Sequence, residues 1–270
     1  MVDYNVNGKV AVVTGGSRGL GLYCAETLAL NGASAVVITS RKAKACEEAK
    51  QYLEKVTREA GKSCKIISLP ADITVEEECN KFYEDTAKAV GGKVDILIAN
   101  AGASWGAPLE DHDVSAVKKV LNLNVVAVFH TIKLFAPLLE KSGTKEDASR
   151  ILIMSSIASI NVNDPVGTYG YLASKAGVSH LGKNLAIQFG PKNINVNSLA
   201  PGFFPTKMSN GLLEVAGPLM IETNPKGRLG VKEDIQAATL FLCAKESNYI
   251  NGIVLPIDGG AHLNPPASKF

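Results

Sequence analysis

The feature that most constrains the fold is a regular alternation of short apolar runs with longer helical patterns. The runs rich in β-branched residues, typical of buried strands, are Lys9–Gly16, Ser34–Ser40, Lys65–Asp72, Val94–Gly102, Ile151–Ser156, Ile194–Gly202 and Gly252–Gly260. The helical patterns are Leu20–Leu30, Ala43–Ala60, Glu76–Val90, Ser115–Leu139, Tyr169–Phe189 and Lys232–Ala244. Strands that are apolar almost throughout belong to parallel sheets covered on both faces. The alternation therefore predicts an α/β fold, a doubly wound parallel sheet of about seven strands with helices on both faces.

The length of the chain would allow one domain or two. Its 270 residues are 46% hydrophobic and 20% charged, which is close to the globular average and sufficient for a sizeable core. The sequence contains no low-complexity linker at which a second domain could begin. We expect a single domain over residues 1–270, with the charged stretch Glu140–Arg150 as an exposed loop.

Charge and cysteine content exclude several classes of protein. Lys and Arg number 28 and Asp and Glu number 26, and the resulting net charge of +2 does not suggest a nucleic-acid binder. The five cysteines are scattered without a metal-ligand spacing, which indicates reduced thiols in an intracellular protein and no metal site. Since no uninterrupted apolar run approaches the length of about 18 residues that a membrane span needs, we expect no membrane segment.

The two ends of the chain bear on its location. The polar N-terminus lacks the apolar segment of a signal peptide, so we expect a cytoplasmic protein. The chain ends in Ser268-Lys269-Phe270, which differs from the peroxisomal signal Ser-Lys-Leu only in its last residue. Peroxisomal import is therefore an alternative, unless a polar tail ends in this way by chance.

A glycine-rich loop lies between the first strand and the first helix. Its spacing is GxxxGxG rather than the GxGxxG of the commonest dinucleotide fingerprint. Glycines allow a tight turn and let backbone N–H groups approach a pyrophosphate, which the helix N-terminus also favours. An ordinary strand–helix turn can contain glycines too, but the strand–loop–helix context favours a Rossmann-type dinucleotide site. The candidate residues are Gly15, Ser17, Arg18, Gly19, Leu20 and Gly21.

The end of the second strand indicates which dinucleotide would bind. An NAD site usually offers an acidic side chain there to the ribose hydroxyls, whereas this chain has Ser40, Arg41 and Lys42. A carboxylate would repel a 2′-phosphate, whereas guanidinium and hydroxyl groups bind it, and Arg18 could approach the same phosphate. Arg41 and Lys42 could instead begin a solvated helix, but a basic pair is electrostatically unfavourable at a helix N-terminus. The sequence therefore predicts NADP(H) as the cofactor.

Tyr171 and Lys175 are candidates for proton transfer. Their spacing of four residues places both side chains on one face of a helix. A nearby ammonium favours the tyrosinate, so we expect Lys175 to lower the pKa of Tyr171 from its ordinary value of about 10. A Tyr and a Lys at this spacing often occur by chance. However, Ser155 and Ser156 end the preceding strand, at the edge where ligands bind in open α/β sheets.

Short motifs follow one another in an order that resembles the short-chain dehydrogenase/reductase family. They are TGGSRGLG from Thr14, ANAG from Ala99, Asn124 in LNLN, MSS from Met154, YLASK from Tyr171 and LAPG from Leu199. The resemblance runs from about residue 8 to residue 260, essentially the whole chain. Each motif alone is weak evidence, and their order makes the set specific.

The resemblance implies a role for each catalytic candidate. Tyr171 corresponds to the proton donor in carbonyl reduction, and Lys175 to the residue that binds the nicotinamide ribose and depresses the pKa of the tyrosine. Ser156 corresponds to the serine that hydrogen-bonds the substrate carbonyl, and Ser155 remains an alternative because the spacing to Tyr171 is slightly long. Asn124 corresponds to the residue that holds a proton-relay water through a helix kink.

The resemblance also implies further cofactor contacts. Asp72 and Ile73 resemble the contact to the adenine after the third strand. The residues that resemble the support of the adenosine ribose and the central sheet are Asn100, Ala101 and Gly102, although such a turn can terminate any strand. The residues that match the stretch beside the nicotinamide carboxamide are Pro201, Gly202, Phe204 and Thr206.

What the resemblance implies overall is an NADP(H)-dependent oxidoreductase that transfers hydride between NADPH and a carbonyl or secondary alcohol. The apolar segment 203–230 falls where the family places a substrate lid, which would suit a 3-oxoacyl thioester or an apolar ketone. The same residues could equally pack against the body or another subunit. A polyol or ketose reductase of the same family and a non-catalytic NADP(H)-sensing protein are alternative functions. The long helices are expected to join subunits into a homotetramer or homodimer.

Overall fold

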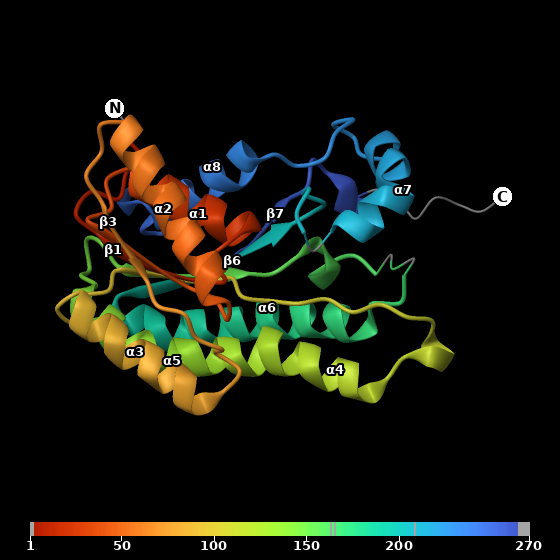
Figure 1. Cartoon of the computed structure of the whole chain (residues 1–270), viewed down its shortest axis with the longest axis horizontal. Helices are drawn as coiled ribbons and strands as arrows, with labels where there is room; N and C mark the ends of the chain where they lie inside the picture. The colour runs from red at the N-terminus through yellow and green to blue at the C-terminus, as the bar shows by residue number, and fades with distance from the viewer. Residues whose placement is uncertain (1–2, 163, 165, 208, 264–270) are drawn as a thin grey trace.

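Seven parallel strands form a sheet at the centre of the molecule (Figure 1). The computed structural model describes residues 3–162, 164, 166–207 and 209–263. The strands are β1 (Val10–Thr14), β2 (Ala35–Thr39), β3 (Lys65–Ser68), β4 (Ile96–Ala99), β5 (Ser149–Met154), β6 (Ile194–Pro201) and β7 (Val254–Ile257). Their order across the sheet is β3-β2-β1-β4-β5-β6-β7, and neighbouring strands are parallel. The predicted doubly wound α/β fold is therefore confirmed.

Helices cover both faces of this sheet. They are α1 (Gly19–Leu30), α2 (Ala43–Glu59), α3 (Glu76–Ala89), α4 (Val114–Leu121), α5 (Ala127–Ser142), α6 (Tyr169–Phe189), α7 (Asn210–Glu222) and α8 (Lys232–Cys243). Figure 1 shows α1, α2 and α8 on one face and α3 to α6 on the other. The remaining helix, α7, lies apart from both layers, beyond the carboxyl ends of the strands.

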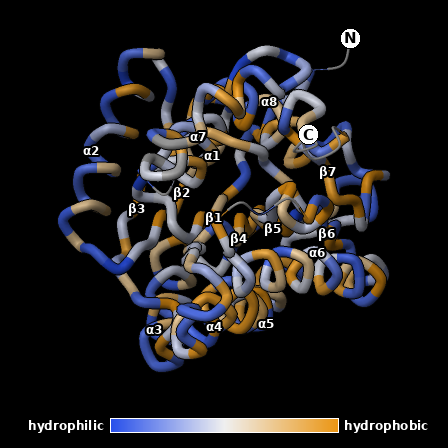
Figure 2. Tube along the Cα trace, turned by 90° about the vertical axis from the view of Figure 1, so that its right-hand side faces the viewer, coloured by the Kyte–Doolittle hydropathy of each residue, from blue (hydrophilic) through white to orange (hydrophobic). Residues whose placement is uncertain are grey.

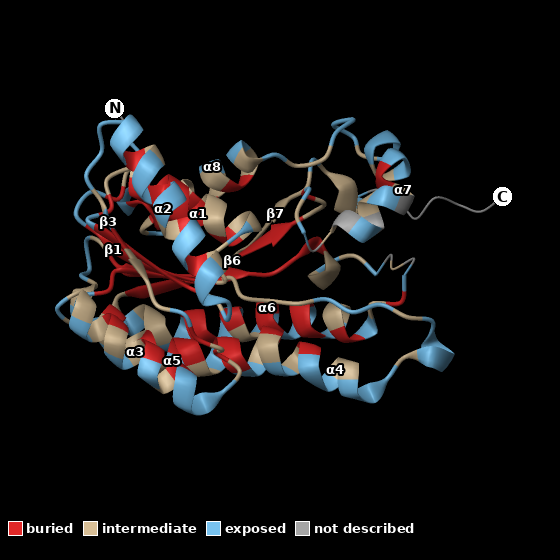
Figure 3. Ribbon diagram, viewed as in Figure 1, coloured by how far each residue is buried: buried red, intermediate tan, exposed pale blue. Residues whose placement is uncertain are grey.

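The sheet is the core of the molecule because its strands carry apolar side chains on both faces. The central strands are buried along their length, as the red ribbon in Figure 3 shows. Successive residues point to opposite faces, so Val13 belongs to the apolar cluster under α1 and Val12 to the cluster under α5. Hydrophobic positions accordingly gather between the layers, while the outer helix faces are polar or mixed (Figure 2).

The order of the strands creates a crevice at one edge of the sheet. From β1 the chain proceeds outward to β2 and β3, and from β4 it proceeds the other way to β5, β6 and β7. The loops that follow β1 and β4 therefore separate to opposite faces of the sheet. Ligands of open α/β sheets bind at such a switch point, outside the carboxyl ends of the strands. The glycine loop follows β1, which places it in this crevice.

The helix predicted over Ser115–Leu139 is longer than expected and contains an irregular turn. A π-helical turn, η2 (Asn122–Val126), connects α4 to α5. Among the described residues, the continuous stretch Val114–Ser142 is the one helix that could cross a membrane by length and composition, with 18 residues at a mean hydropathy of 1.4. In this fold 39% of those residues are buried, and apolar side chains such as Phe135 belong to the core cluster under the sheet.

The prediction of an exposed loop over Glu140–Arg150 is wrong at both ends. The helix α5 continues to Ser142, and β5 begins at Ser149. Arg150 is only 2% exposed, because its guanidinium donates hydrogen bonds to the carbonyls of Ala148 and Ala244 and lies 3.5 Å from the carboxylate of Asp147. A count of charges along the sequence misses a charged group whose partners lie in other parts of the chain.

Candidate active site

The glycine loop after β1 leaves the first turn of α1 open to an anion. Gly15 and Gly19 have φ angles of 65° and 55°, in the left-handed region that favours glycine. A Cβ on Gly21 would lie 2.3 Å from Nδ2 of Asn100, so no larger residue fits there. Arg18 is the N-cap of α1, and no side chain of the described residues caps this helix. Its first backbone N–H groups are therefore available to the pyrophosphate of a dinucleotide.

Ser17 and Leu20 occupy different settings in the same loop. Ser17 is partly exposed. Leu20 is partly buried and packs against the core cluster under α1. Of the two predicted contacts, Ser17 can offer a hydroxyl to a phosphate, whereas Leu20 can offer only its backbone.

Asn100 and Ala101 hold the end of β4 against the end of β1. The side chain of Asn100 donates to the carbonyls of Thr14 and Gly15 at 2.9 Å and 3.2 Å. The hydroxyl of Thr14 accepts the backbone N–H groups of Asn100 and Ala101 at 3.0 Å and 3.1 Å. These bonds hold the glycine loop in place, and a direct contact of either residue with the adenosine ribose stays a prediction.

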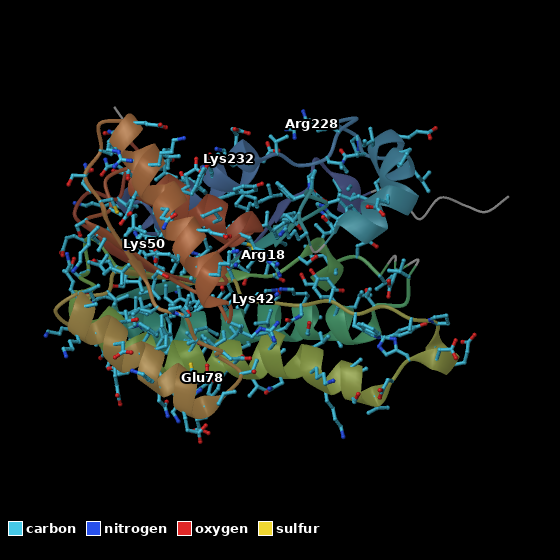
Figure 4. All side chains as sticks on the ribbon, viewed as in Figure 1. Arg18, Lys42, Lys50, Glu78, Arg228 and Lys232 are labelled. Atoms are coloured by element: carbon cyan, nitrogen blue, oxygen red, sulfur yellow. The ribbon has the colours of Figure 1, made fainter. Side chains whose placement is uncertain are left out.

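Basic side chains lie where the 2′-phosphate of NADP(H) would bind. Figure 4 labels Arg18 and Lys42 at the starts of α1 and α2, and both are exposed. The side chain of Arg41 is 70% exposed, and one of its guanidinium nitrogens lies 3.8 Å from a carboxylate oxygen of Asp72. The hydroxyl of Ser40 contacts the thiol of Cys46 at 3.1 Å. The structure therefore offers exposed cations to a phosphate, which fits NADP(H).

The predicted adenine contacts after β3 have local structural roles. Asp72 accepts hydrogen bonds from the backbone N–H and the hydroxyl of Thr74 at 3.0 Å and 2.7 Å. Its own N–H donates to the carboxylate of Glu78 at 2.7 Å. Ile73 is 5% exposed and belongs to the core. An adenine contact at these positions stays a prediction.

Asn124 connects the loop after β4 to α6. It lies in the π-helical turn η2 and is 1% exposed. Its amide accepts from the N–H of Ala103 and donates to the carbonyl of Ala103, each at 2.9 Å, and it also donates to the hydroxyl of Ser174 at 2.9 Å. A Cβ on Gly102 would lie 3.3 Å from Oδ1 of Asn124 and 3.6 Å from Nζ of Lys175. The bare glycine therefore allows these two side chains to approach the same point.

Ser156, Tyr171 and Lys175 come together at the end of β5. Ser156 is the second residue after the strand, while Tyr171 and Lys175 lie one turn apart near the start of α6. The hydroxyl of Ser156 lies close enough to the phenol of Tyr171 to influence its pKa. The Nζ of Lys175 lies 5.5 Å from the centre of the Tyr171 ring and donates to the carbonyl of Met154 at 2.7 Å. Two hydroxyl groups and one amine therefore converge at the edge where a substrate would bind.

The structure distinguishes the two serines that the sequence left open. Ser155 points away from Tyr171, because its Oγ lies 2.5 Å from Oγ of Ser179 and 3.3 Å from the carbonyl of Lys175. Ser156 is the one that meets Tyr171. This geometry favours Ser156 over Ser155 as the group that would hold a substrate carbonyl.

The pKa of Tyr171 differs in direction from the sequence-based expectation. Burial raises it above 10.0, and the hydrogen bond from Ser156 opposes this shift only in part. Burial also lowers the pKa of Lys175 to about 8, so at neutral pH it is still largely an ammonium, but one that donates to the carbonyl of Met154 and does not offset the effect of burial on Tyr171. The expected lowering by Lys175 is therefore wrong for this structure. At neutral pH the phenol keeps its proton, which is the form that a proton donor requires.

The buried Lys175 gives a prediction about stability and pH. Its pKa falls from 10.5 to about 8 on folding, so between these two values the unfolded chain binds more protons than the folded chain. The contribution of Lys175 to the free energy of unfolding must therefore rise with pH, by about 3 kcal/mol across the whole window. Between pH 8 and 10.5, we therefore expect the free energy of unfolding of wild type to rise by about 3 kcal/mol relative to that of Lys175→Met. Denaturant unfolding of both proteins measures this difference.

The comparison with the variant is needed because other groups act in the opposite sense. Burial raises the pKa of the Cys24 and Cys243 thiols to about 12, so above pH 9.0 their ionisation favours the unfolded chain. These thiols are common to both proteins and cancel in the difference. Parallel stability curves for the two proteins would contradict a lowered pKa of Lys175.

The loop after β6 approaches the glycine loop across the crevice. A Cβ on Gly19 would lie 3.4 Å from Cγ2 of Thr206, so these two loops are neighbours. Gly202 has no space for a side chain, because a Cβ there would lie 2.7 Å from Cβ of Asp258. The ring of Phe204 is 4% exposed and packs in the core, so only its backbone can face a cofactor. Pro201 ends β6 and is buried.

Sequence reasoning missed several hydroxyl groups that hold the site. Ser174 accepts from Asn124 and donates to the carbonyl of Tyr171 at 2.7 Å. Ser209 accepts from the N–H of Thr206 at 2.9 Å and lies 3.2 Å from its hydroxyl. Ser179 contacts Ser155. For Ser179 a signal was present, because it is eight residues after Tyr171 and thus lies on the same helical stripe.

Comparison with known proteins places the chain among oxidoreductases over nearly its whole length. A family model described as enoyl-(acyl carrier protein) reductase matches residues 15–262. The rhamnolipids biosynthesis 3-oxoacyl-[acyl-carrier-protein] reductase of Pseudomonas aeruginosa is 37% identical over 264 residues, which cover 96% of this chain and 98% of that protein. The 7alpha-hydroxysteroid dehydrogenase of Escherichia coli is 35% identical over 262 residues, covering 96% of each.

A solved structure supports the same grouping. The Pseudomonas aeruginosa RhlG/NADP active-site complex superposes with a TM-score of 0.88 at 36% sequence identity. The match covers 97% of this chain and 100% of that chain. The fold, the order of the motifs and the cofactor crevice thus agree with a structure that contains NADP.

Proposed function

The chain belongs to the short-chain dehydrogenase/reductase family and is an NADP-dependent oxidoreductase, and from this we propose that it reduces the carbonyl group of an apolar ketone or a 3-oxoacyl thioester. The observation that carries the proposal is the pair of hydroxyl groups of Ser156 and Tyr171 at the carboxyl edge of the sheet, with Lys175 beneath them. The similarity to a 3-oxoacyl-[acyl-carrier-protein] reductase supports a thioester as substrate.

The site residues would divide the chemistry among them. When bound, NADPH supplies hydride to the carbonyl carbon. The hydroxyl of Ser156 donates a hydrogen bond to the carbonyl oxygen and stabilises the negative charge that develops there. The phenol of Tyr171 then gives its proton to that oxygen. The ammonium of Lys175 binds the ribose and stabilises the phenolate that remains, and Asn124 holds a relay water at the π-helical turn.

Exposed apolar side chains around the crevice support an apolar substrate. They come from the loops that follow β4 and β5 and from the start of α6: Trp105, Ile160, Val162, Val166 and Tyr169. The two loops contact each other, since the N–H of Ala107 donates to the carbonyl of Gly167 at 3.3 Å. The ring of Tyr169 packs edge-on against His112 at 5.3 Å. An acyl chain or a ring system would cover this surface on binding.

The segment 203–230 remains our candidate for a substrate lid. It contains α7, which lies at the same edge of the molecule (Figure 1). Leu219 and Ile221 on this helix are 56% and 40% exposed. Met208 lies outside the described residues. Apolar side chains turned to solvent near the crevice suit a segment that closes over an apolar substrate.

A bulky cyclic ketone is a second candidate substrate. The similarity to a hydroxysteroid dehydrogenase favours it, since a secondary alcohol on a fused ring would also cover the apolar rim. A ketose or polyol would leave its hydroxyl groups unpaired against these side chains, which costs binding energy. A non-catalytic NADP(H) sensor would need none of the converging hydroxyl groups.

A panel of carbonyl compounds tests the proposal. The protein is mixed with NADPH and a 3-oxoacyl thioester, a fused-ring ketone or a ketose, and the consumption of NADPH is followed by absorbance. We expect kcat/KM for one of the first two to exceed that for the ketose by about a hundredfold or more, as two unpaired hydroxyl groups would produce. A preference for the ketose would contradict an apolar substrate. NADPH binding without turnover would favour the sensor.

We propose that the outer faces of α5 and α6 join subunits into a homodimer or homotetramer. Apolar side chains there are turned to solvent, with Val126 57%, Phe129 46% and Ile187 74% exposed. A second copy of the chain would bury them, and the mass in solution measures whether it does. A monomeric mass would contradict this proposal.

The proposed peroxisomal signal Ser268-Lys269-Phe270 lies outside the described residues.

A further inference from the structure

Three consecutive residues at the end of β5 each contact a different point on α6. The carbonyl of Met154 accepts from Nζ of Lys175 at 2.7 Å. The hydroxyl of Ser155 donates to the carbonyl of Lys175 at 3.3 Å and lies 2.5 Å from the hydroxyl of Ser179. The hydroxyl of Ser156 faces the phenol of Tyr171. The end of the strand is thus tied to successive turns of one helix.

The contacted residues form one stripe on α6. Tyr171, Lys175 and Ser179 are four residues apart, so their side chains lie one above the other on the face that meets β5. The hydroxyl of Ser155 reaches the carbonyl of Lys175 and the hydroxyl of Ser179, and either serine can supply the proton in the contact of 2.5 Å. A chain of two hydrogen bonds runs from Ser179 through Ser155 to the backbone of Lys175.

This chain of hydrogen bonds is shielded from water. Ser155 is 3%, Ser179 6% and Lys175 5% exposed. A buried hydroxyl that loses its partner costs far more than an exposed one, so the helix cannot rotate or slide on the strand without a penalty. If two apolar side chains replaced Ser155 and Ser179, they would fill the same space but would permit small rotations of α6 on β5.

We propose that Ser155 and Ser179 are positioning residues that fix the rotation of α6 on β5, so that Tyr171 and Lys175 face Ser156. The inference rests on the roles proposed above for these three residues. The side chain of Tyr171 reaches well beyond the helix axis, so a rotation of about 10° would move its hydroxyl by about 1 Å, and a misplacement of this size can cost about a hundredfold in rate. The bond between Ser174 and Asn124 acts toward η2, and the bond from Lys175 to the carbonyl of Met154 ends on a long flexible side chain, so neither fixes the rotation of the helix on β5 as the short contact of Ser155 does.

The strand offers a matched control for the test. Ser149, at the opposite end of β5, is 2% exposed, and its hydroxyl also donates to a helix carbonyl, that of Leu139, at 2.8 Å. Ser149→Ala and Ser155→Ala therefore remove the same kind of buried hydrogen bond from the same strand. We expect both variants to lower Tm by similar amounts, and only Ser155→Ala to reduce kcat, by about tenfold or more. Only Ser155→Ala should also move the pH at which kcat/KM is half-maximal.

Ser179→Ala and the double variant show whether the serines act as one unit. Either single substitution breaks the chain of hydrogen bonds, so the double variant should retain about the kcat of Ser155→Ala. Losses that multiply in the double variant would overturn the paired role. A Ser155→Ala protein with reduced Tm, unchanged kcat and an unchanged pH profile would overturn the positioning role altogether. If Ser155→Ala does not fold, Ser179→Ala carries the same comparison with Ser149→Ala.

One further variant separates failure of this inference from failure of the proposed catalytic roles. If Tyr171→Phe keeps full turnover, the proposed role of Tyr171 is wrong, and positioning of its hydroxyl falls with it. If Tyr171→Phe is inactive while Ser155→Ala resembles Ser149→Ala in every measurement, only the positioning inference is wrong.

Discussion

Tyr171→Phe is expected to lower kcat by about a thousandfold while NADPH binding changes little. The substitution keeps the aromatic ring, which packs beneath Ser156 and 5.5 Å from Nζ of Lys175, and removes only the hydroxyl. A positioned proton donor contributes roughly a hundredfold to ten-thousandfold to such a reaction, and this phenol is protonated at neutral pH because burial raises its pKa. Steady-state rates and a titration of NADPH fluorescence measure the two effects.

A second tyrosine provides the control. Tyr83 on α3 packs edge-on against Phe135 of α5 at 5.3 Å. We expect Tyr83→Phe to retain kcat, since its ring packing is preserved and it lies away from the site. Substantial turnover in Tyr171→Phe would remove this residue from its role and would leave Ser156 as the candidate to be tested next.

Arg41→Asp is expected to reverse the cofactor preference. The guanidinium is 70% exposed at the end of β2 and free to meet a 2′-phosphate. Loss of a charge-assisted hydrogen bond of about 1.5–3 kcal/mol corresponds to roughly tenfold to a hundredfold in affinity, and the new carboxylate adds repulsion. We expect Kd for NADPH to rise by about a hundredfold or more and Kd for NADH to change only slightly. Asp72, whose carboxylate lies 3.8 Å from the Arg41 guanidinium, would lose this cation and add to the negative charge near the phosphate.

The matched control makes the same change of charge in the helix that follows Arg41. Lys55 lies in α2 well beyond its first turn, is 64% exposed and pairs with Glu59. Lys55→Asp alters the net charge by the same amount but leaves the crevice unchanged, so we expect both affinities to stay within about twofold at physiological salt. An unchanged ratio of NADPH to NADH affinity in Arg41→Asp would contradict the assignment of Arg41 to the 2′-phosphate.

The sequence predicted the architecture because the responsible signals are local. Apolar runs such as Ala35–Thr39 predict a strand buried on both faces. The glycines at positions 15, 19 and 21 predict a loop whose conformation and close contacts other residues would not fit. The spacing of Tyr171 and Lys175 needed only the period of a helix. These conclusions concern residues close in the chain, where a few bonds and dihedral angles decide the outcome.

The expectations that failed all concern groups whose environment comes from distant segments. Arg150 belongs to a charged stretch in the sequence, yet the carbonyl of Ala244 makes its burial tolerable. The pKa of Tyr171 was expected to fall because of Lys175, yet the fold partly buries the phenol and directs the buried ammonium to Met154. Burial and partners are properties of the assembled molecule and cannot be read from spacing.

The sequence by itself determined the parallel α/β sheet, the dinucleotide loop and the basic residues that favour NADP(H). Periodicity, glycine spacing and local charge are properties of residues that are neighbours in the chain. Only the tertiary structure decided that Ser156 rather than Ser155 meets Tyr171, and that Ser155 instead joins Ser179. The two serines are chemically identical neighbours that point to opposite sides of the chain. Which side faces the tyrosine depends on how α6 packs against β5, and that packing exists only once the sheet has formed.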